Sequence, residues 1–240
     1  MTRKQTHRSD PGPPAPMRDR LVEAAARILA EHGPSSLSAR RLAAEAGTST
    51  MSVYTHFGSM DDVVQEVLTA STLNLHRLLE RVPRGDDPVA HVALLGRVYR
   101  SAALRRPHIF AAASAKGLLS QGDAGASTPP RGFTWQTLVQ AVQDCLDAGR
   151  YRRPQDSELG AYLHWASVHG FVTLELSGMA PTSGVSGLPF ETMLEGLAIG
   201  AGDDPARAVA SVAASRDTFA DWNRPTDSDQ EPAPAQGPGG

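Results

Sequence analysis

Apolar residues recur at helical spacing along nearly the whole of this chain. The first clear case is Leu21, Ala24, Ala25, Ile28 and Leu29, which follow the i, i+3, i+4, i+7, i+8 pattern and form one apolar stripe. No segment shows the clean alternation of apolar and polar residues that is typical of a half-buried strand. The sequence therefore predicts an all-α protein of about ten helices.

Glycine, proline and capping residues divide the chain into segments of helical length. Gly33-Pro34 ends the first helix, Ser38 is a predicted N-cap of a short helix through Ala46, and Gly47 supplies the turn after it. Ser59 is the predicted cap of a long helix that stops before Pro83. The predicted helices after Gly47 span about 49–56, 59–82, 89–105, 107–119, 133–148, 156–177, 189–199 and 205–222. The residues expected on the buried side of the long helix are Val63, Val64, Val67, Leu68, Leu75, Leu78 and Leu79.

Composition limits the setting in which this chain works. Cys145 is the single cysteine, so no intrachain disulfide can form, which favours a reducing, cytoplasmic location. No apolar stretch is long enough to span a membrane, and no apolar segment follows the first basic residues as in a secretory signal. Residues 1–58 hold eight Lys/Arg against five Asp/Glu, whereas the remaining residues carry a net charge of −6. A basic end on an acidic body suggests that the N-terminal part meets a polyanion.

The segment from Leu37 to Phe57 carries the strongest functional signal. It consists of two short helices joined by a glycine turn, with small alanines that let the helices approach closely. The residues expected to pack together and against the first helix are Leu37, Leu42, Ala43, Ala46, Val53 and Phe57. This packing would hold the second short helix out as a rigid rod, as in a helix-turn-helix.

The exposed side of that rod is rich in hydroxyl groups. It carries Thr48, Ser49, Thr50, Ser52, Tyr54, Thr55 and His56. Hydroxyls suit both phosphate oxygens and base edges, and a helix N-terminus favours phosphate. A structural helical hairpin with a polar face is the plain alternative.

Residues 18–68 resemble the DNA-binding domain of the TetR family of repressors. The resemblance rests on Gly47-Thr-Ser-Thr-Met-Ser-Val-Tyr54-Thr-His56-Phe57, followed by Ser59-Met-Asp-Asp-Val-Val64. By this resemblance Thr48, Tyr54 and His56 would contact phosphates, and Ser49, Thr50 and Ser52 would approach bases. Arg40 would reach the backbone or a base edge.

The chain departs from that family at Met60, where the family usually has a phosphate-contacting lysine. The loss of one ionic contact should lower the salt dependence of DNA binding by about one unit. Basic residues of the N-terminal arm are the proposed compensation through phosphate or minor-groove contacts. These are Arg3, Lys4, Arg8, Arg18 and Arg20.

The C-terminal part resembles a regulatory-domain subgroup of the same family, the WHG domain. The matching residues are Trp165-Ala-Ser-Val-His169-Gly170-Phe-Val-Thr-Leu-Glu-Leu-Ser-Gly178, preceded by Arg106-Pro107-His-Ile-Phe110. The resemblance implies an effector-binding and dimerisation domain. The candidate ligand-binding residues are Tyr99, Phe110, Phe133, Trp135, Trp165 and His169. Such a set suits a small, largely apolar or aromatic effector, and it equally suits an ordinary core.

The predicted organisation is a disordered arm (1–17), a helix-turn-helix DNA-binding domain (18–64), a helical effector-binding and dimerisation domain (65–222) and a disordered tail (223–240). A homodimer is expected, because two recognition helices related by a twofold axis read a pseudo-palindrome better than one does. Helices 156–177 and 189–199 are the expected interface. Leu159, Leu163, Ala166, Gly170 and Thr173 form a stripe that faces either the partner or the chain's own core.

The function predicted from all this is a ligand-responsive repressor that binds a double-stranded DNA operator and is released by its effector. The alternatives are a constitutive DNA-binding regulator without effector and an enzyme with an accessory DNA-binding domain. No phosphate-binding loop, serine-nucleophile motif or metalloprotease motif is present in the sequence, so no enzyme activity, cofactor or metal is predicted. The operator, the effector and the choice between repressor and activator are not contained in the sequence.

Overall fold

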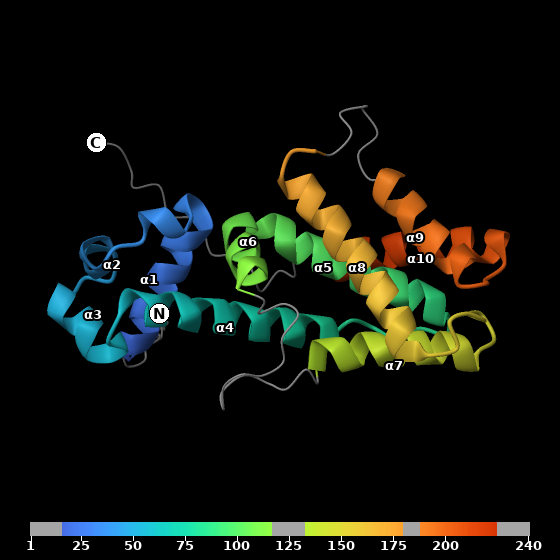
Figure 1. Cartoon of the computed structure of the whole chain (residues 1–240), viewed down its shortest axis with the longest axis horizontal. Helices are drawn as coiled ribbons and strands as arrows, with labels where there is room; N and C mark the ends of the chain where they lie inside the picture. Colours follow the sequence, from blue (N-terminus) through green and yellow to red (C-terminus); the bar gives the residue numbers. More distant parts are fainter. Residues whose placement is uncertain (1–15, 117–132, 180–187, 225–240) are drawn as a thin grey trace, which may run out of the picture. The chain divides into compact units, whose positions relative to one another are not determined.

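The computed structural model describes residues 16–116, 133–179 and 188–224. Over these residues the chain forms ten α-helices and no strand, as the helical spacing predicts. They are α1 (Met17–His32), α2 (Ala39–Glu45), α3 (Thr50–Phe57), α4 (Met60–Glu80), α5 (Pro88–Arg105), α6 (Pro107–Ala115), α7 (Phe133–Asp147), α8 (Ser157–Leu176), α9 (Leu188–Gly200) and α10 (Pro205–Trp222) (Figure 1). A short 3-10 turn, η1 (Pro34–Ser36), follows α1. The end of α6 predicted at Leu119 lies outside the described residues.

The predicted helix caps are present in the structure. The Ser38 Oγ accepts a hydrogen bond from the Arg41 backbone N–H at 3.3 Å and so caps α2. Gly47 takes a φ of +63° in the turn that follows, a conformation that glycine adopts without strain. Ser59 and Asp62 bond to each other's backbone N–H groups at 3.1 Å, which closes a reciprocal cap at the start of α4.

The chain divides into two compact units. Unit 1 comprises residues 1–74 and 106–121, and unit 2 comprises residues 75–105 and 122–240. The helix α6, which follows α5 in sequence, belongs to unit 1, where Ile109 and Ala113 join the core formed by α1 to α4. The expected DNA-binding domain ended at residue 64, whereas unit 1 extends to residue 74 and includes α6. The inclusion of α6 depends on contacts between segments that are far apart in the sequence.

Unit 1 is built around an apolar core. The side chains of Leu21, Leu29, Leu42, Val53 and Val63 are almost completely buried there. The four residues expected on the buried side of α4 within this unit also face the core, three of them fully buried and Val64 partly. Each fully buried aliphatic side chain contributes about 1.5–3 kcal/mol, so the core holds the short helices α2 and α3 in place.

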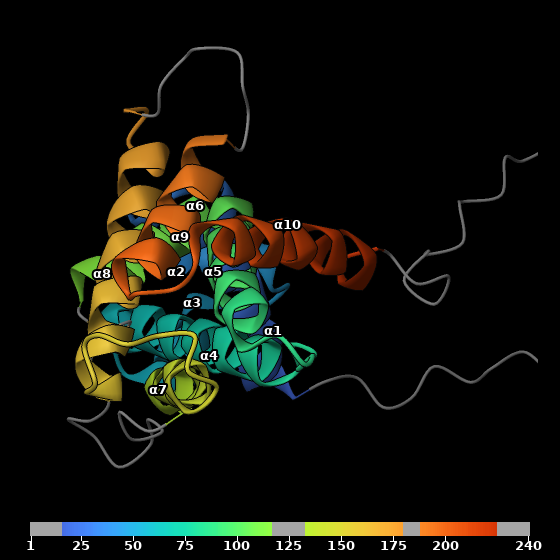
Figure 2. The same cartoon turned by 90° about the vertical axis from the view of Figure 1, so that its right-hand side faces the viewer.

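Unit 2 is a bundle in which α5 is the central helix. Six consecutive residues of α5, His91 to Gly96, are buried, and α7, α8 and α10 all pack against this helix. The helices α8 and α9 lie beside each other, and α10 packs against α9 and runs across α5 (Figure 2). Cys145 is completely buried in this core, where burial raises the pKa of its thiol, as fits a structural rather than a nucleophilic role.

Candidate functional site

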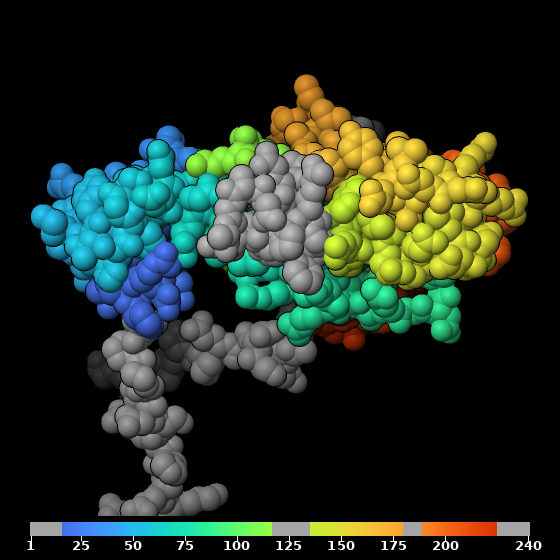
Figure 3. Space-filling model, turned by 60° about the horizontal axis from the view of Figure 1, so that its bottom comes forward, coloured from blue at the N-terminus to red at the C-terminus, as the bar shows by residue number. Residues whose placement is uncertain are grey.

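The helix α3 is anchored by two of its eight residues. Val53 is fully buried and Phe57 is 7% exposed, one helical turn apart on the face that packs on Leu42, Ala43 and Ala46. The remaining positions of α3 therefore project from unit 1. In the space-filling view the light-blue surface around α3 forms one end of unit 1 (Figure 3).

Two arginines of α1 fix this arrangement from the side. Arg20 donates from Nη2 to the Ala46 carbonyl oxygen at 2.7 Å, at the end of α2. The Arg18 guanidinium lies 4.9 Å from the centre of the Phe57 ring and pairs with Glu66 of α4 at 2.7 Å. These contacts give structural partners to both arginines, which were also among the residues proposed to compensate for the missing lysine by contacts with DNA.

The seven residues predicted to contact DNA all lie on or beside α2 and α3 in unit 1. Five are exposed, namely Arg40, Ser49, Thr50, Tyr54 and His56, while Thr48 and Ser52 are half-buried. Two further residues lie on the same outward surface: Thr55, which was expected there, and Met51, which the prediction omitted. Met51 is 72% exposed.

Ser49 has a structural role in addition to its predicted one. Its Oγ accepts a hydrogen bond from the Ser52 backbone N–H at 3.2 Å and forms the N-cap of α3. One lone pair of the hydroxyl is thereby used, while its hydrogen remains a donor at the exposed end of the helix.

Met60, which replaces the family's lysine, packs against the apolar core of unit 1 and is partly buried. Its side chain contributes to packing between α4 and the rest of the unit. The departure from the expected lysine therefore has a structural use here.

A second candidate site lies in unit 2, between α5 and α8. The Tyr99 hydroxyl lies 2.8 Å from the His169 Nδ1, and the Trp165 ring stacks on the His169 ring with centroids 5.0 Å apart. Tyr162, which is 54% exposed, extends the row to 6.4 Å from Trp165. Burial lowers the pKa of His169 and raises that of Tyr99, so both groups are neutral near pH 7.

Three of the six predicted ligand-binding residues are thus brought together: Tyr99, Trp165 and His169. Trp135 packs partly buried on the core of unit 2, and Phe110 is buried in α6, which belongs to unit 1. The side chain of Phe133 lies outside the described residues.

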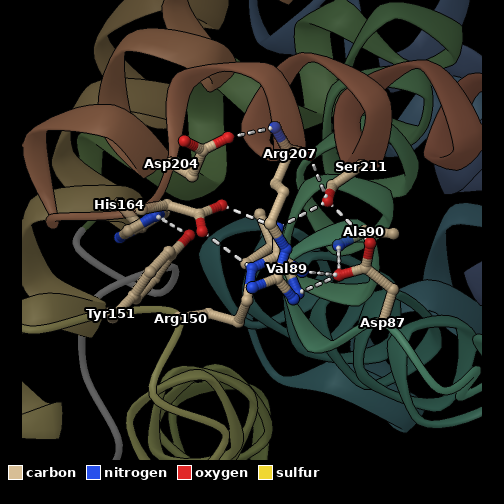
Figure 4. Close-up of polar contacts among 10 residues, drawn as sticks. Asp87, Val89, Ala90, Arg150, Tyr151, His164, Asp204, Arg207 and Ser211 are labelled. Carbon is tan, nitrogen blue, oxygen red and sulfur yellow. Dashed lines mark hydrogen bonds and ion pairs between the residues drawn. The ribbon is translucent and has the colours of Figure 1, made fainter.

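A buried ionic network lies elsewhere in unit 2 (Figure 4). Arg150 is 5% exposed and donates from Nε and Nη2 to the two carboxylate oxygens of Asp203, each at 2.7 Å. Nη2 also donates to the Ser211 hydroxyl, and Nη1 donates to Asp87. Burial alone would raise the pKa of Asp87, but hydrogen bonds from Ser211 and the Ala90 backbone, with the Arg150 charge, lower it overall. These groups satisfy one another, so we interpret the network as structural.

In the described ranges, no group of three or more His, Cys, Asp or Glu side chains is arranged to hold a metal ion. None of the helices described is both long enough and apolar enough to cross a membrane.

Comparison with known protein families matches both parts of the chain. Residues 21–67 match the model of bacterial regulatory proteins of the tetR family, and residues 92–197 match that of the tetracyclin repressor-like C-terminal domain. The second model is not that of the WHG subgroup, so the subgroup stays a prediction.

Individual proteins are similar to this chain in sequence or in fold. An uncharacterised helix-turn-helix transcriptional regulator of Mycobacterium tuberculosis is 27% identical over 162 residues, which cover 68% of this chain and 71% of the relative. A structure from Rhodococcus sp. RHA1 covers 89% of this chain and 98% of its own, with 23% identity and a TM-score of 0.59. The structure of RolR in complex with resorcinol covers 82% of this chain and 93% of its own, with 15% identity and a TM-score of 0.59. The structure of an ArpA-like γ-butyrolactone receptor covers 85% of this chain and 97% of its own, with 16% identity and a TM-score of 0.59.

Proposed function

Because residues 21–67 and 92–197 match models of tetR-family regulators, we propose that this chain is a TetR-type dimeric repressor that binds a pseudo-palindromic DNA operator and is released by a small-molecule effector. The observation that carries the proposal is the arrangement of α3. The helix is anchored by Val53 and Phe57, and its exposed positions present mainly uncharged side chains to solvent, several of them with hydroxyl groups. Such a face can enter a major groove without desolvating many charges.

Within this proposal the seven predicted residues have distinct tasks. Tyr54 and His56, exposed towards the end of α3, would donate to phosphates together with Thr48. The side chains at the start of α3, Thr50 and Ser52, would approach base edges, along with the hydroxyl of the capping Ser49. Arg40 on α2 would contact the backbone or a base edge.

The outward surface of α8 and α9 supports dimerisation. Leu159 and Leu163 are 48% and 46% exposed, and Leu174 of the same helix is 53% exposed. On α9, Ile199 is 37% exposed beside Gly196 and Gly200. Apolar side chains next to glycines suit close packing of helices from two subunits around a twofold axis.

The open space around Gly170 also supports a dimer interface on this surface. A methyl group at its Cβ position would meet no other atom of the described chain within 4 Å, so no helix of this protomer requires a glycine there. A glycine in a helix interior costs about 0.5–1 kcal/mol relative to alanine. Close approach of a helix from the partner would account for its presence, and of the two orientations left open for the stripe we favour the partner-facing one.

For the effector site we propose the cluster of Tyr99, Trp165 and His169. Two stacked rings offer an aromatic surface, and a neutral tyrosine and a neutral histidine offer hydrogen bonds at its edge. A small aromatic or largely apolar effector with at least one hydroxyl or carbonyl group fits this chemistry. RolR, whose structure was determined with resorcinol, and the γ-butyrolactone receptor are fold relatives consistent with such an effector.

The proposed mechanism is a shift between two arrangements of the dimer. One arrangement holds the recognition helices at a spacing that matches successive major grooves, and the effector binds the other more tightly. The effector weakens operator binding only by its difference in affinity for the two arrangements. The helix α4 contributes residues to both units, so a change in unit 2 can reach unit 1 through it.

The experiment that tests the function is selection of bound duplexes from a random DNA pool. The full-length protein should recover a pseudo-palindrome. Tyr54→Ala, which changes a side chain that is 48% exposed and leaves the core intact, should lose it. Tyr54→Phe separates the hydroxyl from the ring and serves as the matched control. Recovery of no preferred sequence by the wild-type protein, at low and at moderate salt, would contradict the proposal.

A further inference from the structure

The centre of the outward face of α3 is occupied by Met51 and Thr55. Successive residues of a helix are turned by about 100°, so the direction opposite the buried pair Val53 and Phe57 falls at position 55, with position 51 about 40° to one side. The hydroxyl residues Thr50, Ser52 and Tyr54 lie on the flanks of this direction. The two central side chains would reach furthest into a groove that receives α3.

This centre is largely apolar. The Met51 side chain is 72% exposed and has no hydrogen-bond donor. The Thr55 hydroxyl donates its hydrogen to the Met51 carbonyl oxygen at 2.9 Å, so that donor is already satisfied within the helix. The middle of the face therefore has little capacity to donate hydrogen bonds to bases.

Within unit 1, the exposed large apolar side chains lie on this helix. In the described residues of unit 1, Met51 and Tyr54 are the two large apolar or aromatic side chains that are exposed, and both lie on α3. Unit 1 otherwise buries such side chains in its core. The position of Met51 is thus a local exception at the proposed DNA surface.

We propose that Met51 reads thymine by contact with its C5-methyl group, at one position in each half-site of the operator. The proposal rests on the proposed function and deepens it. In the major groove the thymine methyl is the distinctive apolar group, and an apolar side chain recognises it without a hydrogen bond. The flexible thioether side chain of methionine adapts well to such a contact.

The test measures the methyl contact directly. On the duplex selected by the wild-type protein, each thymine is replaced in turn by uracil, symmetrically in both half-sites, which removes the methyl and leaves base pairing unchanged. Burial of one methyl corresponds to about fourfold in affinity, so one symmetric pair of replacements should weaken binding about 15-fold. In Met51→Ala the same replacement should have little effect.

Met179→Ala is the matched control, because Met179 is 70% exposed and lies in unit 2 after α8. This variant should keep the full uracil penalty. A penalty that persists undiminished in Met51→Ala, or the absence of any thymine position with a penalty in the wild-type protein, would overturn the assignment of Met51 while leaving the proposed function intact. Failure of the wild-type protein to select any duplex would instead overturn the proposed function, and this inference with it.

Discussion

In unit 1 the ion pairs lie at the surface, around an apolar core. In unit 2 some ion pairs are buried in the interior. The pair Arg18–Glu66 has side chains 46% and 39% exposed, and Arg27–Glu45 has side chains 52% and 46% exposed. In unit 2 the Arg150 and Asp203 side chains are only 4% and 1% exposed. We therefore expect ion pairs to matter more for the stability of unit 2 than for that of unit 1.

The difference has a physical consequence for each unit. An exposed ion pair contributes at most about 1 kcal/mol, so unit 1 owes its stability to side-chain packing. A buried charge that loses its partner is costly, so the interior of unit 2 tolerates the removal of one partner poorly. Directional contacts of this kind also define how α5, α7 and α10 sit together in unit 2.

The largest effect expected from this comparison is that of Asp203→Asn. The variant keeps the shape of the side chain but leaves the buried Arg150 with Asp87 as its remaining carboxylate. We expect a loss of about 3 kcal/mol in the free energy of unfolding. Urea unfolding followed by tryptophan fluorescence measures it, because Trp135, Trp165 and Trp222 all belong to unit 2.

Glu45→Gln is the matched control in unit 1, where it breaks the exposed pair with Arg27. Unfolding followed by far-ultraviolet circular dichroism should show a change below about 1 kcal/mol. Equal losses in the two variants would remove the distinction between the units.

A smaller effect is expected at two glycines of α8 that differ in surroundings. A Cβ at Gly160 would lie 2.8 Å from the Val142 Cγ1, so Gly160→Ala forces α8 and α7 apart. The strain of about 1–3 kcal/mol should exceed the gain in helix propensity and destabilise unit 2 by about 1–2 kcal/mol.

Gly170→Ala serves as the counterpart because space is open around its Cβ position. The protomer should gain about 0.5–1 kcal/mol of stability. If α8 forms the proposed dimer interface, the same variant should dissociate at a higher protein concentration in sedimentation measurements. A variant that dimerises like the wild-type protein would argue against close helix approach at this position.

The two units also differ in how much of their structure the sequence could predict. The helices around the proposed DNA surface follow from local signals, namely the spacing of Leu21 to Leu29, the caps at Ser38 and Ser59 and the turn at Gly47. The same helical period applied to Val53 would have placed Met51 at the centre of the exposed face. Met51 is absent from the predicted set because that set rests on hydroxyl groups, which can bond to phosphates and base edges.

Unit 2 was less predictable because its contacts join distant segments. Arg150 and Asp203 are 53 residues apart, and nothing near either residue in sequence indicates the pairing. The contact between Tyr99 and His169 spans 70 residues, and the shared aromatic character of the predicted set could not show which members meet. Helix positions are set locally, whereas the partners of buried polar groups are set by the tertiary fold.

The stability of unit 2 should also depend on pH. His164 is 6% exposed; its Nδ1–H donates to the Gly160 carbonyl at 2.9 Å, and its Nε2 accepts from the Tyr151 hydroxyl at 3.2 Å. Burial lowers the pKa of His164, so the folded protein keeps the ring neutral at pH values where the unfolded chain protonates it. The stability is complete above about pH 6.5 and is lost as the pH falls towards the lowered pKa.

We expect the urea midpoint seen by tryptophan fluorescence to fall between pH 7.5 and 5.5. Each such histidine contributes at most about 1.4 kcal/mol per pH unit. His91, which is also buried with a lowered pKa, adds to the slope. His164→Asn keeps a donor for the Gly160 carbonyl but cannot titrate, so its slope should be shallower. An unchanged slope in that variant would place the pH dependence elsewhere.

A small effect on stability is also expected at Ser49, where unit 1 combines a structural and a proposed functional role. Ser49→Ala removes the N-cap of α3 and should cost about 1 kcal/mol. Ser49→Asp keeps a good cap and favours the positive end of the helix, so its unfolding free energy should stay near that of the wild-type protein.

The two variants should separate further in DNA binding. The carboxylate in Ser49→Asp stands at the exposed start of α3, where the hydroxyl would approach a base edge close to the DNA phosphates, so binding to the selected duplex should be lost although the fold is intact. Ser49→Ala should weaken binding less. Tight binding by Ser49→Asp would mean that the start of α3 stays away from the DNA backbone, and the surface by which unit 1 binds DNA would have to lie elsewhere on it.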